Sequence, residues 1–443
     1  MKFENTFQTL PDFLYEEVSP TPVTSPKLMH VSDLKKEIPI DLSEDELVFW
    51  LNGEKNLPGE QRISTRYAGH QFGVWAGQLG DGRAISLGEI NKYEIQTKGS
   101  GLTPFSRMGD GKAVIRSSVR EYLCSIAMRG LKIPTTDVLA LITGKDEVIR
   151  EKIERSAIVA RVFPSNIRFG HFEMCYHYDK KTELKALIDY TQSQFYPGLS
   201  IEEMLQEIVS RTAKLVAHWQ SVGFCHGVMN TDNMSILGLT IDYGPFGFLE
   251  DTVLNYICNH SDHQGRYAYH RQPSVALWNL ERLLVCFMDH VSKEKLESML
   301  NSYKEIFESE NLRLFRLKLG IPSLEKQPLD DLLMILHKNS IDFTYFFREH
   351  HNPEFWEYYG KMEELKGWIS TYNPQPRNDI NPKYILRNYI AQEVIEEVEG
   401  DINSKLLSWI KILQDPFSEH QGFENYARPT PPSLKNITVS CSS

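Results

Sequence analysis

The sequence lacks the cysteine patterns that assign a protein to a disulfide-rich or zinc-ribbon class. Its 6 cysteines stand at positions 124, 175, 225, 258, 286 and 441, and no two of them form a C-x-x-C pair. This spacing indicates neither a dense disulfide framework nor a zinc ribbon. We therefore expect a protein of a reducing compartment.

Long apolar runs and excess positive charge are also missing. No segment approaches the roughly 18 consecutive apolar residues of a membrane span. Residues 1–18 carry several acids in place of a signal-peptide core or an Arg-rich transit peptide. With 48 Lys+Arg against 59 Asp+Glu, the net charge of -11 argues against a broad surface for nucleic acid or anionic lipid. We expect a cytoplasmic protein with neither nucleic acid nor membrane as partner.

The chain of 443 residues is long enough for two or three domains. Prolines interrupt any regular hydrophobic pattern in residues 1–60. We therefore expect this segment to be an arm that wraps around the surface, with one short helix at 44–52. Residues 61–185 carry most of the strand patterns and predict a small sheet-containing lobe. Residues 186–443 are mainly helical and predict a larger lobe with a C-terminal extension. This order, with strands in the first half of the chain and helices in the second, indicates an α+β protein.

Hydrophobic spacing predicts the individual elements. Two strands within residues 84–98 meet at Asn91-Lys92, and alternation places Lys98 on the polar face of the second strand. Ser118 to Glu121 fits a capping box, which predicts a helix that ends at Gly130. The clearest helix covers 201–222. Further strands are expected at 138–142, 156–163, 234–237 and 239–242, and further helices at 275–290, 293–308, 329–338 and 383–398.

Two glycine-rich segments have the composition of anion-binding loops. In residues 77–83, glycines would let backbone amides approach a phosphate, and Arg83 adds a permanent charge. Residues 99–112 form a second such segment with basic flanks. Asp81-Gly82 is also an ordinary hairpin turn, and the second segment could be a mobile loop.

A strand lysine followed by a helix glutamate is the arrangement by which kinases orient a lysine toward nucleotide phosphates. Lys98 and Glu121 fit this pattern, although a solvated strand lysine and a capping glutamate would explain each alone. Arg161 and Arg168 could reach phosphate oxygens with their planar guanidinium groups. His260 and His263 suggest a metal site, but without a further ligand pair we favour polar loop packing.

The strongest motif follows the helix at 201–222. Residues 226–233 read His-Gly-Val-Met-Asn-Thr-Asp-Asn, and residues 242–244 read Asp-Tyr-Gly. This is the layout of a kinase catalytic loop and a metal-binding D-x-G, except that Val228 stands at the catalytic aspartate. Asp232 is the nearest carboxylate that could act as a base. Asn233 and Asp242 offer the oxygen ligands that Mg²⁺ or Mn²⁺ prefers beside phosphates.

These segments resemble the selenoprotein O family, whose bacterial members are also called YdiU. The matching stretches are residues 67–83, 98–121, 161–170 and 226–248, and the resemblance covers nearly the whole chain. It implies a protein-kinase-like two-lobed fold that binds ATP in an inverted orientation and transfers AMP to Ser, Thr or Tyr hydroxyls of proteins. Related bacterial enzymes are similar in attaching UMP from UTP with Mn²⁺.

The resemblance also implies roles for single residues. Asp232 is expected to accept the proton, Asn233 and Asp242 to bind the metal, and Glu121 to be the structural partner of Lys98. The expected nucleotide contacts are Gly80, Gly82, Arg83, Lys98, Asp110, Gly111, Arg161, Arg168 and Asp242.

Two other functions remain open at this stage. An ordinary phosphotransferase is disfavoured by Val228, because valine cannot accept a proton. A nucleotide-binding scaffold without activity is disfavoured because the cleft retains Lys98, Glu121, Asn233 and Asp242. Cys441 stands where several family members carry selenocysteine, and we hypothesise that oxidation ties it to Cys258.

Overall fold

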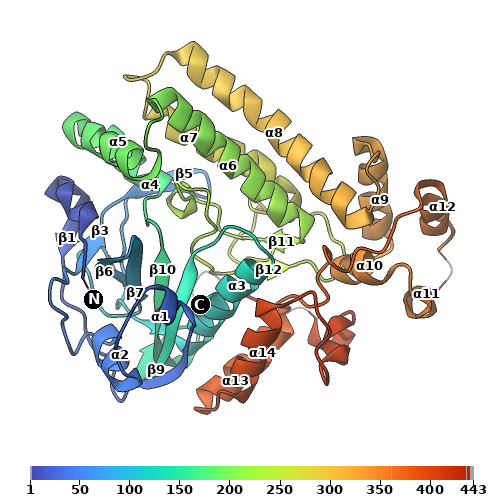
Figure 1. The fold of residues 1–443 in the computed structure, drawn as a ribbon, viewed down its shortest axis with the longest axis horizontal. Coiled ribbons are helices and arrows are strands. Elements are labelled where there is room, and N and C mark those ends of the chain that lie inside the picture. Colours follow the sequence, from blue (N-terminus) through green and yellow to red (C-terminus); the bar gives the residue numbers. More distant parts are fainter. Residues whose placement is uncertain (1, 361, 436, 440–443) are drawn as a thin grey trace.

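The computed structural model describes residues 2–360, 362–435 and 437–439 (Figure 1). It is a mixed α/β structure around one antiparallel sheet of 8 strands, in the order β1-β3-β6-β7-β10-β9-β2, with β8 paired to β10. The strands are β1 Tyr15–Glu17, β2 Lys27–Val31, β3 Ile63–Thr65, β6 Ala84–Ile90, β7 Tyr93–Lys98, β8 Ala113–Val114, β9 Asp137–Ile149 and β10 Ile153–Phe163. Two separate pairs are β4 Ala68–Gln71 with β5 Val74–Gln78, and β11 Phe224–Cys225 with β12 Gly247–Phe248.

The sheet is covered on both faces, and neighbouring residues of one strand therefore enter different cores. In β10, Ile158 packs in the core that includes Trp50 of helix α2 (Glu44–Leu51). Val159 packs instead in the core that includes Leu123 of helix α3 (Ile115–Gly130). Because both faces are buried, Lys98 points toward α3 rather than toward solvent. The face of β7 that carries Lys98 is therefore polar, as predicted, but it lies in the interior of the protein.

The remaining helices make up most of the second half of the chain. Helix α6 (Ile201–Ser221) packs against α7 (Gln272–Val285) and the long α8 (Lys293–Leu319), as Figure 1 shows. Helices α13 (Asn388–Glu399) and α14 (Ser404–Gln414) return to pack on α3. The others are α1 Leu34–Glu37, α4 Phe169–His177, α5 Lys181–Phe195, α9 Lys326–Lys338, α10 Phe343–Glu349, α11 Pro353–Tyr359 and α12 Glu363–Tyr372.

Several predicted elements are confirmed and others are wrong. The turn at Asn91-Lys92 has φ values of 52° and 66°, as a two-residue hairpin requires, and the helix from residue 201 is confirmed. The capping box at Ser118 is wrong, because β8 runs directly into α3 and Ser118 is buried inside that helix. The predicted strands at 234–237 and 239–242 are also wrong. Only single bridges, Arg168 to Ser235 and Thr135 to Thr240, pair this segment.

The first 60 residues contribute to the sheet itself. Strand β1 pairs with β3 and strand β2 pairs with β9, so the two strands stand at opposite ends of the strand order. Both outer positions of the sheet are thus filled from the N-terminal segment.

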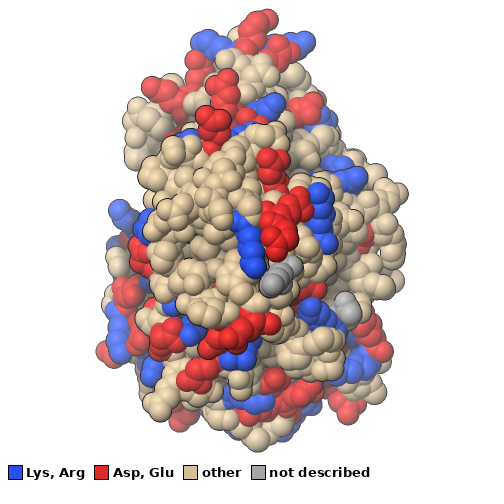
Figure 2. Space-filling model, turned by 90° about the vertical axis from the view of Figure 1, so that its right-hand side faces the viewer, with Lys and Arg blue, Asp and Glu red and all other residues tan. Residues whose placement is uncertain are grey.

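Charged residues of both signs are interspersed on the face of the molecule drawn in Figure 2. Among the described residues, no helix combines the length and apolar character needed to cross a bilayer.

A single buried lysine stands out in the helical half. Lys318 in α8 is 5% exposed, and its Nζ lies 4.5 Å from the ring centroid of Phe347. It has no ion pair with any described residue. Burial lowers the pKa of Lys318 to about 7.

We predict that Lys318→Met stabilises the fold at neutral pH and that the gain shrinks at high pH. Between the folded pKa and the unfolded value of about 10.4, the unfolded chain binds more protons, so wild-type stability rises with pH. The advantage of the variant in free energy of unfolding should fall by roughly 3–4 kcal/mol from pH 7 to pH 10. Denaturant unfolding at both pH values measures it. A difference that is the same at both would contradict the prediction.

Candidate functional site

One cavity of about 590 Å³ brings the predicted site residues together. Its wall is formed by the segment before β6, the loop before β8, the ends of β7 and β10, and the loop after β11. Glu121 lies behind this wall, where it contacts Lys98. The predicted residues that line the cavity are Gly80, Gly82, Arg83, Lys98, Asp110, Gly111, Arg161, Arg168, Asp232, Asn233 and Asp242.

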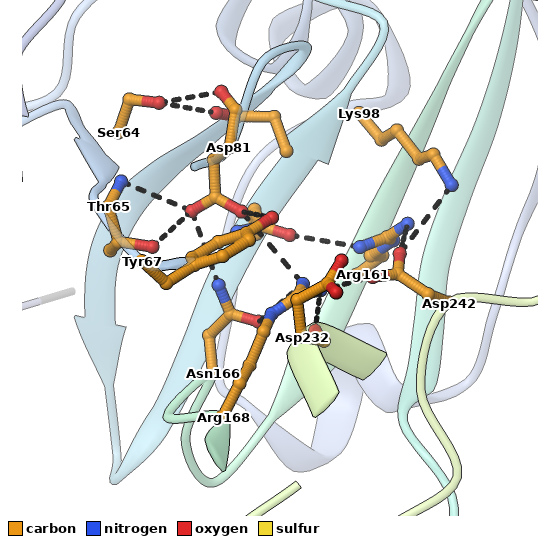
Figure 3. Close-up of polar contacts among 12 residues, drawn as sticks. Ser64, Thr65, Tyr67, Asp81, Lys98, Arg161, Asn166, Arg168, Asp232 and Asp242 are labelled. Atoms are coloured by element: carbon orange, nitrogen blue, oxygen red, sulfur yellow. Dashed lines mark hydrogen bonds and ion pairs between the residues drawn. The ribbon is translucent and has the colours of Figure 1, made fainter. Parts of the chain in front are cut away.

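Asp242 is the anion on which the cations of the cavity converge (Figure 3). Its carboxylate pairs with Arg168 and lies 2.8 Å from Arg161 Nη2 and 3.7 Å from Lys98 Nζ. Glu121 shares two of these cations, with Oε2 at 2.6 Å from Lys98 Nζ and Oε1 at 2.5 Å from Arg161 Nε. The pair of Lys98 and Glu121 expected from the sequence is thus part of a five-residue charge cluster.

The charge states in this cluster depend on one another. Burial alone would raise the pKa of Asp242, but Arg168, Arg161 and Lys98 hold it well below its usual value. The pKa of Glu121 is lowered against the effect of burial by Arg161 and Lys98. Burial and the repulsion of Arg161 lower the pKa of Lys98 to about 8. The carboxylates are therefore fixed as anions, while Lys98 can still exchange its proton near neutral pH.

Arg83 lines the cavity without an ion pair, although Glu121 and Asp242 lie near enough to favour its charged form. Its guanidinium makes no hydrogen bond or ion pair with any described residue, and burial lowers its pKa. An unpaired arginine in a cavity is a ready site for a phosphate or carboxylate, which its planar donors bind in pairs.

Asp81 is a site residue that the sequence reading missed. It is buried, and its carboxylate accepts hydrogen bonds from Thr65 and from Asn166 Nδ2 at 3.3 Å. Arg168 Nη2 lies 3.9 Å away, and the Arg168 guanidinium lies over the Tyr67 ring at 4.9 Å from its centroid. Asp81 thus holds Arg168 in place. In the sequence, Asp81-Gly82 has the pattern of an ordinary turn, so its contact with Arg168 could not be predicted.

Asp110 makes a contact that the sequence could not indicate. Its carboxylate accepts hydrogen bonds from Arg150 Nη1 at 2.8 Å and Arg150 Nη2 at 2.9 Å. Arg150 lies just after β9 and lines the same cavity. A carboxylate repels phosphate, so the arrangement favours Asp110 as the residue that positions Arg150, with the arginine as the anion contact.

The loop after β11 is fixed by hydrogen bonds to its own backbone. Asn233 Nδ2 donates to the Val228 carbonyl at 3.0 Å, which leaves the amide oxygen of Asn233 as its free ligand atom. His226 Nε2 lies 2.9 Å from the Ile241 carbonyl and ties the loop to the segment that carries Asp242. Asp242 has a φ of 56°, a left-handed conformation that is uncommon outside glycine. Val228 lines the cavity without a side chain that can take a proton.

The hairpin of β4 and β5 packs directly on Asp232. Gln71 Nε2 donates to Asp232 Oδ2 at 3.2 Å, and the His70 amide donates to Thr231 Oγ1 at 2.7 Å. A Cβ at Gly69 would lie 2.8 Å from Asp232 Oδ1, so glycine is required for this approach. Burial raises the pKa of Asp232 to about 7, although Gln71 and Arg168 act in the opposite direction.

The donor set around Asp242 fits a hard divalent cation. Asn233 and Asp242 offer one amide oxygen and one carboxylate, and both line the cavity. Asp232 Oδ1 is buried and has no hydrogen-bond partner among the described residues. Oxygen-only ligands of this kind suit Mg²⁺ or Mn²⁺ beside phosphate oxygens.

The described end of the chain runs past Cys258. The His260 amide donates to the Val439 carbonyl at 2.9 Å, and Asn259 forms a bridge with Val439. Cys258 is buried, and Cys441 lies outside the described residues, so the hypothesis of a bond between them stays a prediction.

Comparison with known proteins identifies the family. A sequence model described as "Protein adenylyltransferase SelO" matches residues 1–366. The chain belongs to the SelO family. The protein nucleotidyltransferase YdiU of Bordetella petrii is 42% identical, and the match covers 100% of this chain and 98% of the relative. The protein of the same name from Yersinia pseudotuberculosis is 41% identical, covering 100% of this chain and 99% of the relative. The resemblance inferred from the motifs is therefore confirmed.

We predict that Glu121→Gln in this SelO-family chain weakens binding of ATP with Mg²⁺ by about tenfold or more, since one ion-paired partner of Lys98 and Arg161 is lost. Calorimetric titration measures the affinity. Melting temperature is followed in parallel, because the buried cations lose an anion.

Glu154→Gln is the matched control for this prediction. Glu154 is also a buried glutamate paired with an arginine, Arg116, at 2.9 Å, but neither residue lines the cavity. The control should lower the melting temperature without changing the affinity for ATP. Equal losses of affinity in both variants would mean that Glu121 acts only through general stability.

Proposed function

We propose that this chain transfers AMP from ATP to Ser, Thr or Tyr hydroxyls of proteins and releases pyrophosphate. The observation that carries the proposal is the composition of one cavity. It combines Lys98, Arg161 and Arg168 around the metal-ligand candidate Asp242, yet has Val228 where a phosphotransferase needs a base. The name of the matching family and the names of the relatives support the same activity.

The proposed reaction forms one bond and breaks one. The acceptor hydroxyl oxygen attacks the α-phosphorus, and the bond from that phosphorus to the bridging oxygen of the pyrophosphate breaks. Asp232 takes the hydroxyl proton. Its place in the cavity, its contact with Gln71 and its unpartnered Oδ1 among the described residues support this role.

The cations of the cavity would offset the charge of the reacting phosphates. Arg83 forms no ion pair with a described residue, and Lys98, Arg161 and Arg168 are held in place by carboxylates behind or beside them. Donors that are fixed before the reaction stabilise developing charge without reorganisation. Gly80 and Gly82 line the cavity, and a side chain on either would collide with Phe105. Arg150, held by Asp110, would join the anion contacts.

Asn233 and Asp242 would hold Mg²⁺ or Mn²⁺. When bound, the ion would supply Lewis-acid neutralisation of the transferred and leaving phosphate oxygens. For Asp242 to bind it, the pairing with Arg168 must loosen, and the incoming phosphates offer that arginine a replacement anion.

The finer points of the proposal rest on the family and on the site. A protein-kinase-like two-lobed fold is supported by the Lys98–Glu121 pair between β7 and α3 and by the order of loop motifs after α6. Inverted ATP would present the α-phosphate to the acceptor. Use of UTP with Mn²⁺ and a cytoplasmic location remain parts of the proposal.

We predict that ATP labelled at the α-phosphate marks protein in the presence of Mg²⁺ or Mn²⁺, whereas ATP labelled at the γ-phosphate does not. The purified chain is incubated alone and with a mixture of candidate acceptor proteins, and the adduct mass is read by intact mass spectrometry. α-Labelled UTP is run in parallel to decide between AMP and UMP transfer.

Each other outcome points to a different function. Label from the γ-phosphate alone would identify a phosphotransferase. Binding of ATP without transfer from either position, to the chain or to any acceptor, would favour a nucleotide-binding scaffold. Either result overturns the proposal.

We predict different losses for the two proposed metal ligands. Asp242→Asn keeps the shape and the hydrogen-bonding oxygen but removes the charge, so transfer should fall by about 100-fold or more. Asn233→Ala removes a neutral ligand and should cost about tenfold, part of which returns at higher Mn²⁺ concentration. Initial rates against metal concentration give both effects, and melting temperatures verify folding. A larger loss for Asn233→Ala would contradict the ranking.

A further inference from the structure

A second group of potential metal ligands lies on the outer side of the β4–β5 hairpin. His70 belongs to β4, and Glu173 and His177 belong to α4. The two α4 residues are four positions apart and therefore share one face of the helix. The hairpin packs on α4, which brings His70 to that face.

The three side chains already converge. His70 Nδ1 lies 2.6 Å from Glu173 Oε1, and one ligand atom from each of the three residues lies within 4.8 Å of the other two. Ligands at about 2.0–2.1 Å around a tetrahedral zinc ion are separated by roughly 3.3 Å, so small side-chain rotations close the site.

The ion pair with His70 leaves one carboxylate oxygen of Glu173 without a hydrogen-bond partner among the described residues. This oxygen is Oε2, and the side chain that carries it is 0% exposed. A buried carboxylate oxygen without a donor is costly, so such an atom calls for a missing partner. A cation at this position would supply it.

The surroundings suit a bound ion that is reached from one side. The His177 ring lies 4.1 Å from Trp75, and the His70 ring lies 5.3 Å from Trp278. These tryptophans fix the imidazole planes, while His177 is exposed and leaves a path for entry. Arg282, a neighbouring cation, is paired with Glu281 at 2.6 Å.

We propose that His70, Glu173 and His177 form a transition-metal site that binds Zn²⁺, with water in the fourth position. Two imidazoles and one carboxylate are a zinc donor set, whereas Mg²⁺ prefers oxygen ligands and stays in the nucleotide cavity. This site does not depend on the proposed function.

The site would join the hairpin to α4 next to the proposed base. Gln71, which follows His70, donates to Asp232, and the His70 amide donates to Thr231. A metal bound to His70 would therefore restrain the contacts that Asp232 receives. This makes the three residues positioning groups rather than catalytic ones.

The test measures zinc directly. The full chain is stripped with chelator and dialysed against limiting ZnCl₂ with excess MgCl₂, and bound zinc is counted by elemental mass spectrometry. We expect one tightly bound zinc per chain, about 10- to 100-fold weaker binding in His177→Gln, and a zinc-dependent rise in melting temperature that this variant lacks. His177 is exposed, so the variant should fold.

Two control variants locate the ion. His260→Gln with His263→Gln removes a pair of loop histidines whose ring centroids are 6.3 Å apart, and Asp242→Asn alters the nucleotide cavity. Both should keep the zinc. Absence of tight zinc in the wild-type chain, or its loss in either control but not in His177→Gln, overturns the proposal. Hydrogen exchange adds a second measure, since zinc should slow exchange in residues 68–78 of the wild-type chain.

Discussion

The carboxylate of Asp242 is the constraint on which the candidate site depends. Lys98, Arg161 and Arg168 surround it. Glu121 pairs with the first two of these cations, and Asp81 lies 3.9 Å from Arg168. Three buried cations thus face three carboxylates, and Arg83 adds a fourth positive charge that has no ion pair with a described residue. A buried excess of one sign is unfavourable unless something neutralises it. A bound polyphosphate, as in the proposed function, would neutralise this excess.

The sequence predicted the parts of this site that depend on short-range order. Lys98 at the end of a strand, Glu121 inside the next helix, and the spacing of Asn233 and Asp242 after a long amphipathic helix are all local patterns. The helix from residue 201 and the turn at Asn91-Lys92 follow from the same kind of signal. The family motifs then indicated that these residues meet, and the structure places them in one cavity.

What the sequence could not predict depends on pairing between distant segments. Arg150 reaches Asp110 only because the β9–β10 turn lies over the loop before β8. Asp81 reads as a turn residue until Arg168 and Asn166 are brought to it. Ser118 looked like a helix cap because nothing in its neighbourhood shows that β8 continues into the helix. In each case tertiary contacts override a valid local signal.

The placement of β1 and β2 has a consequence for how the chain is made. These strands fill the two outer positions of the sheet, but their partners β3 and β9 lie up to about a hundred residues later. Strand β2 therefore cannot pair until β9 has been synthesised, whereas β1 can pair with β3 much earlier. Without β1 and β2, the strands β3 and β9 would offer open edges, which favour association with other chains. The N-terminal segment thus covers both edges of the sheet, although its two strands become able to pair at different times during synthesis.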